Sequence, residues 1–286
     1  MRQNEDCSPP RTGANPLYRG ALLNRWDEAL RRGVPGLFVG APGGFGKTVA
    51  LVQWLHGRRS GVGWLTLDEH HDHEPRLVSG LLRALAFAQR RNRRLAALAR
   101  REGPFSEEDL FDALDRVVLD GERTHLLVLD DLHCLADPKT IRLLLRFLKR
   151  LPRSFAVCLA GRALPDPLDE LVLKGDLEVT PASALAFTLE EVEALLRRRK
   201  GRRPGDAETL FARTGGWPMA VAAFLRGDRP DEVEDRRNQD LLFSYLETHV
   251  WGFLDEDTRE VLLRASLAPS LTPRRCRCLT GRADSE

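Results

Sequence analysis

Long apolar stretches are missing from this chain of 286 residues, both at its N-terminus and elsewhere. A membrane-spanning helix needs roughly 18 or more apolar residues in a row. The first residues, MRQNEDCSPPRTGANP, are polar and contain prolines, which argues against a signal peptide. An excess of one charge is missing as well, because 44 basic and 42 acidic side chains leave a net charge of +2. Such a balance provides no overall field for nucleic acid or an anionic membrane, and we expect no membrane partner.

Cysteine is sparse, and its spacing suggests no disulfide framework. The five cysteines are scattered along the chain: Cys7, Cys134, Cys158, Cys276 and Cys278. An odd number without regular spacing is typical of reduced thiols in the cytosol, and we therefore predict a cytoplasmic location. The Cys-x-Cys pair near the C-terminus has no second pair, which argues against a zinc site.

The hydrophobic pattern predicts an α/β fold. Apolar residues make up 42% of the chain, an ordinary value for a globular protein with a buried core. Up to residue 180, short apolar runs bounded by turns alternate with helical patterns, which is typical of a parallel sheet flanked by helices. The predicted strands are residues 36–40, 63–67, 125–130, 155–160 and 177–179.

Capping motifs mark several helix starts. Ser106 with Asp109 has the spacing of a capping box, and so has Thr188 with Glu191. Beyond residue 180 the pattern is helical only, which predicts an all-helical part after the sheet. After the helix that starts at Thr188, further helices are predicted near residues 206–213, 218–226, 240–253, 256–265 and 273–279.

A glycine-rich loop follows the first predicted strand and precedes a helix. It reads Ala41-Pro-Gly-Gly-Phe-Gly-Lys-Thr48, the pattern G-x-x-x-x-G-K-[ST] with alanine in the first position. Glycines let such a loop curl so that successive N–H groups point at phosphate oxygens, and the helix adds its positive N-terminal end. In this pattern the lysine reaches the β- and γ-phosphates and the threonine hydroxyl binds Mg²⁺. The residues predicted to bind ATP or ADP are Pro42, Gly43, Gly44, Phe45, Gly46, Lys47, Thr48 and Val49.

Two carboxylates favour this interpretation over an incidental glycine-rich turn. Asp130 and Asp131 end an apolar run further along the chain, and ligands of parallel α/β folds bind at the carboxyl ends of strands. We predict that Asp130 binds Mg²⁺ together with Thr48, and that Asp131 orients the attacking water as a base. Arg162 follows the next strand. It is predicted to stabilise the γ-phosphate, with an ordinary loop arginine as the alternative.

Other charged clusters have simpler interpretations. The run Asp68–His73 contains side chains that can bind metals, but they are consecutive rather than spaced on a scaffold. The basic runs Arg90–Arg94 and Arg197–Lys200 follow amphipathic helices, where cations at the C-terminal end are common. We therefore interpret these runs as solvated surface and helix-end charge rather than as metal or nucleic-acid sites.

With these motifs in place, the chain resembles a known group, the large ATP-binding LuxR-type transcriptional regulators similar to the maltose-regulon activator. They belong to the STAND class, the signal-transduction ATPases with numerous domains. The resemblance covers residues 17 to 283, and the Gly-Trp-Pro element at 216–218 is more specific than the P-loop. The matching segments besides the loop are Leu17–Leu23, Gln53-Trp54, Gly63–Glu69, Leu129–His133, Gly161-Arg162, Thr214–Pro218, Tyr245–Glu247, Leu262–Ser266, Cys276 and Leu279–Gly281.

The resemblance implies a nucleotide-operated switch. Members of the group bind ATP or ADP at this domain, rest in an ADP form, and self-associate in an ATP form. They activate transcription through a C-terminal helix-turn-helix. By resemblance, Arg19 lies near the nucleotide and Pro218 touches the adenine. The resemblance also implies ATP-dependent self-association in a longer form of the protein.

Two departures from the group are visible. Ala41 replaces the first glycine of the loop, and the chain stops at Glu286, before most of the winged-helix domain, the sensor repeats and the DNA-binding domain. We therefore expect either the N-terminal part of a regulator or a gene product without output modules. DNA would be bound only through a C-terminal domain that this chain does not contain.

These observations predict a domain order and a function. The leading hypothesis is an ATP/ADP-binding switch domain with slow, Mg²⁺-dependent ATP hydrolysis. One alternative is an AAA+-like ATPase that uses steady hydrolysis for mechanical or loading work. Another is a P-loop kinase, against which the Gly-Trp-Pro segment argues. The predicted segments are a disordered tail (1–15), a P-loop nucleotide-binding domain (16–183), a small helical domain (184–235) and a partial winged-helix domain (236–286).

Overall fold

The structure divides the chain into two compact units, Met1–Met219 and Ala220–Glu286. The segment boundaries predicted from the sequence, at 15/16, 183/184 and 235/236, stay predictions. The computed structural model describes residues 7–13, 16–58, 61–101, 105–115, 117, 125–199, 205–225, 240, 243–248, 251–266 and 272–280.

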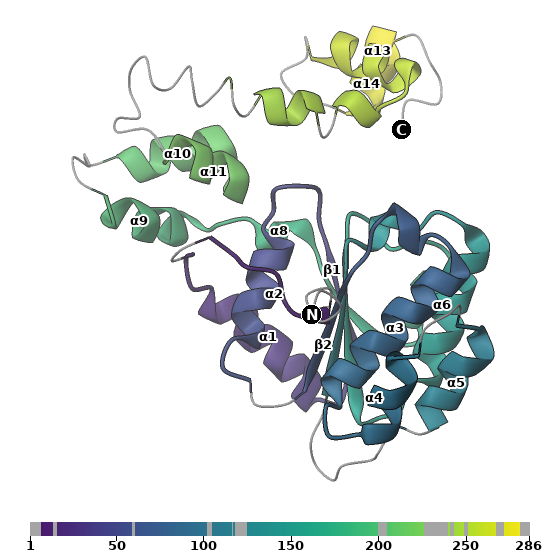
Figure 1. Cartoon of the computed structure of the whole chain (residues 1–286). Helices are drawn as coiled ribbons and strands as arrows, with labels where there is room; N and C mark the ends of the chain where they lie inside the picture. The colour runs from purple at the N-terminus through teal and green to yellow at the C-terminus, as the bar shows by residue number, and fades with distance from the viewer. Residues whose placement is uncertain are drawn as a thin grey trace. The chain divides into compact units, whose positions relative to one another are not determined.

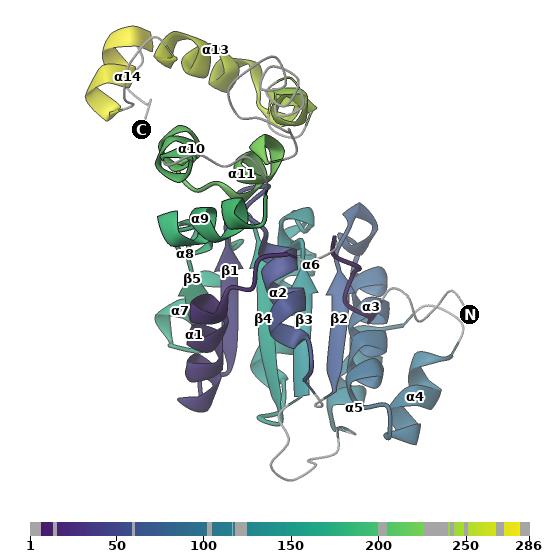
Figure 2. The ribbon, with the colours of Figure 1, turned by 90° about the vertical axis from the view of Figure 1, so that its left-hand side faces the viewer.

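The first unit is built on a five-stranded sheet in the order β2-β3-β4-β1-β5 (Figure 2). Every neighbouring pair is parallel, which confirms the predicted α/β class. Gly40 lies opposite Gly161, and Thr66 opposite Asp130, so the carboxyl ends of four strands meet at one edge. The strands are β1 (Gly36–Gly40), β2 (Val62–Thr66), β3 (His125–Asp130), β4 (Phe155–Gly161) and β5 (Leu177–Thr180).

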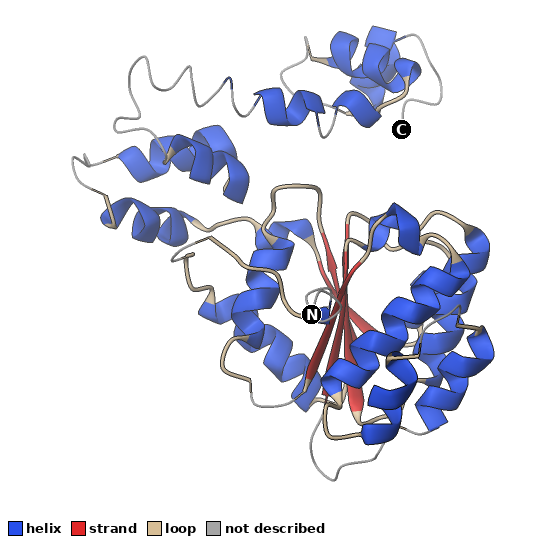
Figure 3. Ribbon diagram, viewed as in Figure 1, coloured by secondary structure: helices blue, strands red, loops and turns tan. Residues whose placement is uncertain are grey.

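Helices cover both faces of this sheet (Figures 1 and 3). β3 is buried along its whole length, and its side chains alternate between two hydrophobic cores. Leu126 and Val128 pack with the helices of one face, whereas Leu127 and Leu129 pack with those of the other. The first face carries α1 (Gly20–Arg31), α2 (Lys47–Leu55) and α8 (Ala182–Leu185), and the second carries α3 (Glu74–Ala88), α4 (Arg93–Ala99), α5 (Glu107–Asp115), α6 (Pro138–Arg150) and α7 (Asp169–Leu173).

Side-chain caps fix where several of these helices begin. Ser106 and Asp109 bond reciprocally at the start of α5, as predicted. Asp68 accepts from the backbone N–H groups of two histidines in the short 3-10 helix η2 (Glu69–His71). Asp68 therefore stabilises a local turn, whereas Asp72 accepts from the backbone N–H groups of Ala136 and Asp137 before α6. Among the described residues, no group of three or more His, Cys, Asp or Glu side chains is placed to bind a metal ion.

The elements of the described chain after β5 are all helices. α9 starts at the predicted capping box of Thr188 and Glu191. In the predicted helix 240–253, residues 241, 242, 249 and 250 lie outside the described part, as do Lys200 and Gly281. No helix in the described ranges is long and apolar enough to cross a membrane. The elements not yet located are η3 (Leu132–Cys134), α9 (Leu189–Arg197), α10 (Asp206–Thr214), α11 (Pro218–Phe224), η4 (Trp251–Phe253), α13 (Glu256–Ala265) and α14 (Pro273–Thr280).

Candidate nucleotide site

The glycine-rich loop leaves the sheet between β1 and β4. The N–H of Ala41 donates to the carbonyl of Gly161 at 3.1 Å, which ties the loop to the end of β4. Gly44 and Gly46 have φ of +79° and +74°, a region that residues with a side chain rarely adopt. The loop therefore curls sharply, and α2 begins at Lys47 immediately after it. This is the strand, loop and helix arrangement that the motif requires.

Lys47 is folded into this loop. Its side chain is buried, and Nζ donates to the carbonyls of Ala41 at 2.8 Å and Pro42 at 3.1 Å. Burial lowers the pKa of Lys47, while the charges of Asp131 and Asp130 act in the opposite direction. An ammonium group has three donors, so one remains for an anion bound in the curl.

Thr48 and Asp130 meet across the mouth of the loop. The hydroxyl of Thr48 donates to Oδ2 of Asp130 at 2.7 Å, and the other carboxylate oxygen accepts from the N–H of Asp131 at 3.0 Å. Asp130 is only 1% exposed, and burial raises its pKa. A hydroxyl and a carboxylate side by side are oxygen ligands of the kind that Mg²⁺ takes. The structure thus brings together the two side chains that the sequence predicted as metal ligands.

Asp131 and Arg162 flank this pair. Asp131 has φ of +58°, the one positive value at a non-glycine residue in the described ranges, and its side chain is 41% exposed. Arg162 directly follows β4, and its charge acts on Lys47. His133 was not predicted as a site residue, yet its Nδ1 lies 3.8 Å from Oδ1 of Asp131. Burial, with the nearby charge of Arg162, lowers the pKa of His133.

The Gly-Trp-Pro segment contacts the loop directly. Nε1 of Trp217 donates to the carbonyl of Gly43 at 3.3 Å, and the N–H of Met219 donates to the carbonyl of Gly44 at 3.1 Å. Pro218 is buried between these two contacts and begins α11. Trp217 lies in the predicted Gly-Trp-Pro element, but neither Trp217 nor Met219 was predicted as a site residue.

Two other residues predicted to bind the nucleotide are Phe45 and Val49. The ring of Phe45 lies 6.5 Å from that of Trp217 at an interplanar angle of 35°. Val49, in the first turn of α2, is 36% exposed. Phe45 therefore contributes an apolar wall on the side of the Gly-Trp-Pro segment.

Arg19 lies in a different network. Its guanidinium group donates to the carbonyl of Leu185 at 2.6 Å and to that of Ala186 at 2.9 Å. It also pairs with both oxygens of Glu191, each at 3.0 Å, and lies over the ring of Phe187. Arg19 thus joins the start of α1 to the link between α8 and α9. Its predicted proximity to nucleotide stays a prediction.

Comparisons with known proteins show a resemblance to transcriptional regulators. No protein-family profile matches the chain. It is 29% identical over 258 residues to the HTH-type transcriptional regulator MalT of Vibrio campbellii, an alignment that covers 86% of this chain and 28% of the relative. The chain resembles the MalT regulators. MalT of Klebsiella pneumoniae is 27% identical over 247 residues, which cover 82% of this chain and 27% of that protein. The chain therefore spans well under a third of the length of these MalT relatives.

Solved structures support the fold independently. The Walker-type ATPase PABY2304 of Pyrococcus abyssi matches with a TM-score of 0.58 and 15% identity, over 92% of this chain and 83% of that one. The Aeropyrum pernix Orc1 protein, solved in complex with DNA, matches with a TM-score of 0.54 and 16% identity, over 94% and 78%. At such identities the likeness shows the P-loop fold alone. Together with the MalT resemblance, it supports a nucleotide-binding regulatory domain.

Proposed function

We propose that this chain is the ATP/ADP-binding switch domain of a signal-transducing transcriptional regulator. The observation that carries the proposal is that one loop makes two kinds of contact. It contains Lys47 and Thr48, which face the predicted phosphate and metal positions. It is also hydrogen-bonded to Trp217 and Met219, which are among the last residues of this unit in the sequence. A change at the phosphates therefore reaches the segment that leads out of this unit.

The loop residues fit a nucleotide phosphate chain. The positive φ values of Gly44 and Gly46 curl the loop, a conformation in which successive N–H groups can bind a phosphate, and a Cβ built on Gly46 would meet no atom within 4 Å, so the space beside it is open. Lys47 supplies the cation, and Thr48 with Asp130 supplies oxygen ligands. Mg²⁺, when bound there, neutralises phosphate charge. Pro218, beside the loop, is the residue we assign to the adenine.

We assign slow hydrolysis to the flanking residues. Asp131 is exposed enough to accept a hydrogen bond from water, whereas Asp130 is buried against Thr48. Arg162 lies where its charge acts on Lys47, and we propose that it stabilises the γ-phosphate. A switch needs only slow turnover, because the lifetime of the ATP state is its signal.

We propose that the output of the switch depends on parts that the relatives contain outside the aligned region. The MalT relatives are named HTH-type transcriptional regulators, and this chain covers 28% of the Vibrio protein. We propose that DNA binding and ATP-dependent self-association belong to the longer form, in the cytoplasm. ATP and ADP can operate such a switch only if they bind its two conformations with different affinities, because a ligand shifts a conformational equilibrium by no more than that difference. The proposed states differ in whether Trp217 and Met219 contact the loop.

One experiment tests the proposal most directly. The purified chain is denatured, the released nucleotide is identified, and steady-state ATP turnover is then measured with added Mg²⁺. We expect bound ADP or ATP and a turnover well below the ~10 s⁻¹ that is typical of enzymes. Steady turnover at or above that typical rate would favour the AAA+-like alternative. Absence of both bound nucleotide and ATP binding would refute the proposal.

A further inference from the structure

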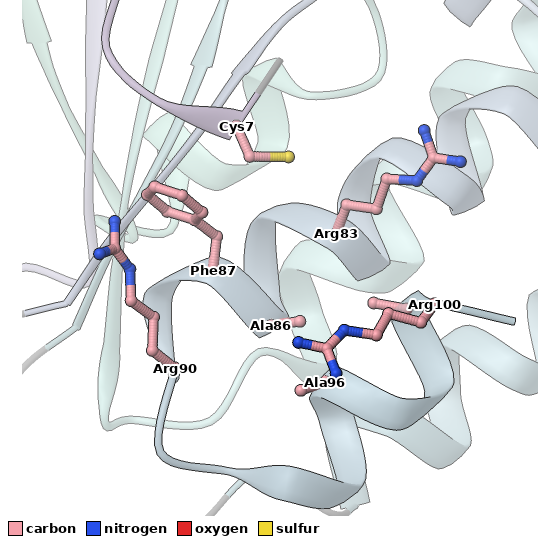
Figure 4. A pocket seen from close by; sticks show the side chains of 8 residues that line it. Cys7, Arg83, Ala86, Phe87, Arg90, Ala96 and Arg100 are labelled. Carbon is pink, nitrogen blue, oxygen red and sulfur yellow. The ribbon is translucent and has the colours of Figure 1, made fainter. Parts of the chain in front are cut away.

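A hollow lined by arginines lies away from the nucleotide site, between Cys7 and helices α3 and α4 (Figure 4). Its volume is about 350 Å³, and the described residues that line it include three arginines but no carboxylate. Ala86 and Phe87 of α3 form its apolar floor with Ala96 and Ala99 of the α4 side. Figure 4 shows Arg83 and Arg90 on either side of Phe87, with the guanidinium group of Arg100 directed toward Ala86 and Ala96.

Two arginines of α3 lie on one face of the helix. Arg76 and Arg83 are seven residues apart, which is close to two helical turns and places them about 10 Å apart, and Arg90 follows just beyond the end of the helix. Arg83 also lines a second hollow, of about 770 Å³, together with Arg76 and Arg11. The two hollows share Cys7 and Arg83, so they form one continuous basic surface.

The charges of this surface lack partners. Within the described part of the chain, the side chains of Arg76, Arg83 and Arg100 make no hydrogen bond or ion pair, and Arg90 only lies over the ring of Phe87 at 4.0 Å. Asp68, the one carboxylate among the described residues that line the second hollow, is already bonded to His71. Like charges in one hollow repel one another, and a bound anion removes this repulsion.

We propose that this surface binds a small organic anion with two or more phosphate or carboxylate groups and a flat apolar part. Guanidinium groups match phosphate and carboxylate oxygens with paired hydrogen bonds. The volumes of the hollows fall in the usual range of small-molecule sites, ~300–1,000 Å³. Phe87 and the alanine floor receive the apolar part, while Arg83 and Arg100 bind the charged groups. The lining includes no residue of the glycine-rich loop, so this site does not depend on the proposed nucleotide site.

The test uses 8-anilinonaphthalene-1-sulfonate, a fluorescent probe with flat rings and one anionic group. It is titrated into the whole chain carrying Lys47→Ala, which removes the cation of the glycine-rich loop, and is then displaced with inorganic pyrophosphate. We expect one saturable site that pyrophosphate competes for. Arg83→Gln and Arg100→Gln should each weaken probe binding at least about tenfold. Arg94→Gln is the matched control, because this exposed arginine of α4 lines neither hollow.

Thermal unfolding of each variant shows whether it is folded, and Arg100→Gln changes an exposed side chain. Unchanged probe binding in the double variant Arg83→Gln/Arg100→Gln would overturn the proposal. So would an equal loss in Arg94→Gln, or a failure of pyrophosphate to compete. ATP binding is measured separately, on the chain with Lys47 unaltered. Loss of probe binding can therefore be distinguished from loss of nucleotide binding.

Discussion

Lys47 combines burial with incomplete hydrogen bonding. Two of its three donors are used by carbonyls of its own loop, and burial lowers the pKa of its ammonium group. A buried cation is costly unless it is paired, and nearby Asp130 and Asp131 offset this cost electrostatically. A phosphate bound in the loop would add a full negative charge at short range.

Replacing this cation should remove nucleotide binding and leave the fold intact. We expect Lys47→Ala to lose ATP binding beyond detection, because no other lysine follows the curl of the loop. Isothermal titration calorimetry measures the affinity, and circular dichroism checks the fold. The control is Lys174→Ala, an exposed lysine just before the amino end of β5, at the opposite edge of the sheet. ATP binding by Lys47→Ala with the affinity of the unaltered chain would end the assignment.

The two neighbouring carboxylates should separate binding from hydrolysis. Asp130→Asn should weaken Mg²⁺-dependent ATP binding, because a metal ligand acts in the ground state. Asp131→Asn should keep ATP bound but suppress hydrolysis, because a base acts only in the transition state. Each replacement keeps the side-chain volume, and binding and single-turnover hydrolysis are measured on both variants. Equal loss of affinity in the two variants would contradict the separation.

At the scale of elements, the glycine-rich loop and the start of α11 approach closely at Gly44. A Cβ added there would lie 2.8 Å from Nε1 of Trp217 and 2.9 Å from Cβ of Met219. Gly44 therefore satisfies two requirements, a positive φ for the curl and free space for the incoming segment. This position couples the loop to the helical segment more tightly than the phosphate-binding motif alone requires.

A pair of glycine substitutions isolates this contact. Gly44→Ala and Gly175→Ala carry the same backbone strain, since their φ values are +79° and +78°, but nothing lies within 4 Å of a Cβ at Gly175. We expect Gly175→Ala to cost about 1–2 kcal/mol of unfolding free energy. Gly44→Ala should cost about 1–3 kcal/mol more, because of the collision with Trp217. Chemical denaturation measures both. Equal costs would show that the segment is not in contact with the loop in solution.

Arg19 stabilises the connection between the sheet and α9. We expect Arg19→Ala to lower the unfolding free energy by about 3 kcal/mol, because it leaves Glu191 and two carbonyls without their buried partner. Arg197→Ala is the control on α9, since its pair with Glu193 is exposed and such pairs contribute about 0.5 kcal/mol or less. Denaturant unfolding compares the two. Similar small losses in both variants would exclude a structural role for Arg19 at this link.

At the scale of the whole molecule, nucleotide binding should stabilise the first unit by mass action. With Mg²⁺-ATP at about one hundred times its Kd, the unfolding free energy rises by about 2.7 kcal/mol. The slowest amides of β1 and β3, buried at the centre of the sheet, should then exchange about one hundredfold more slowly. Hydrogen exchange with mass spectrometry measures this, with Lys47→Ala as the control that should show no slowing. If ATP left the exchange rates of the unaltered chain unchanged, ATP would not bind to the first unit as proposed.

Local sequence patterns were sufficient to predict the strands of the sheet and the central residues of the candidate nucleotide site. Short runs bounded by turns predicted all five strands, and the inner strands β1, β3 and β4 were the clearest because a parallel strand buried on both faces has to be largely apolar. Gly46-Lys47-Thr48 and Asp130 were identifiable because each ends or follows such a run, and the carboxyl ends of parallel strands share one edge. The bond between Thr48 and Asp130 shows that these distant residues meet as expected.

Contacts between residues far apart in the chain had no such pattern, and only the tertiary structure decided them. The sequence determined which residues form the loop, the strands and the helix caps, since these depend on neighbours a few positions away. It did not indicate that Trp217 bonds to Gly43, that Arg19 pairs with Glu191, or that Cys7 is buried beside α3. Such contacts depend on how packed helices and loops place side chains in space, and no periodicity encodes that placement.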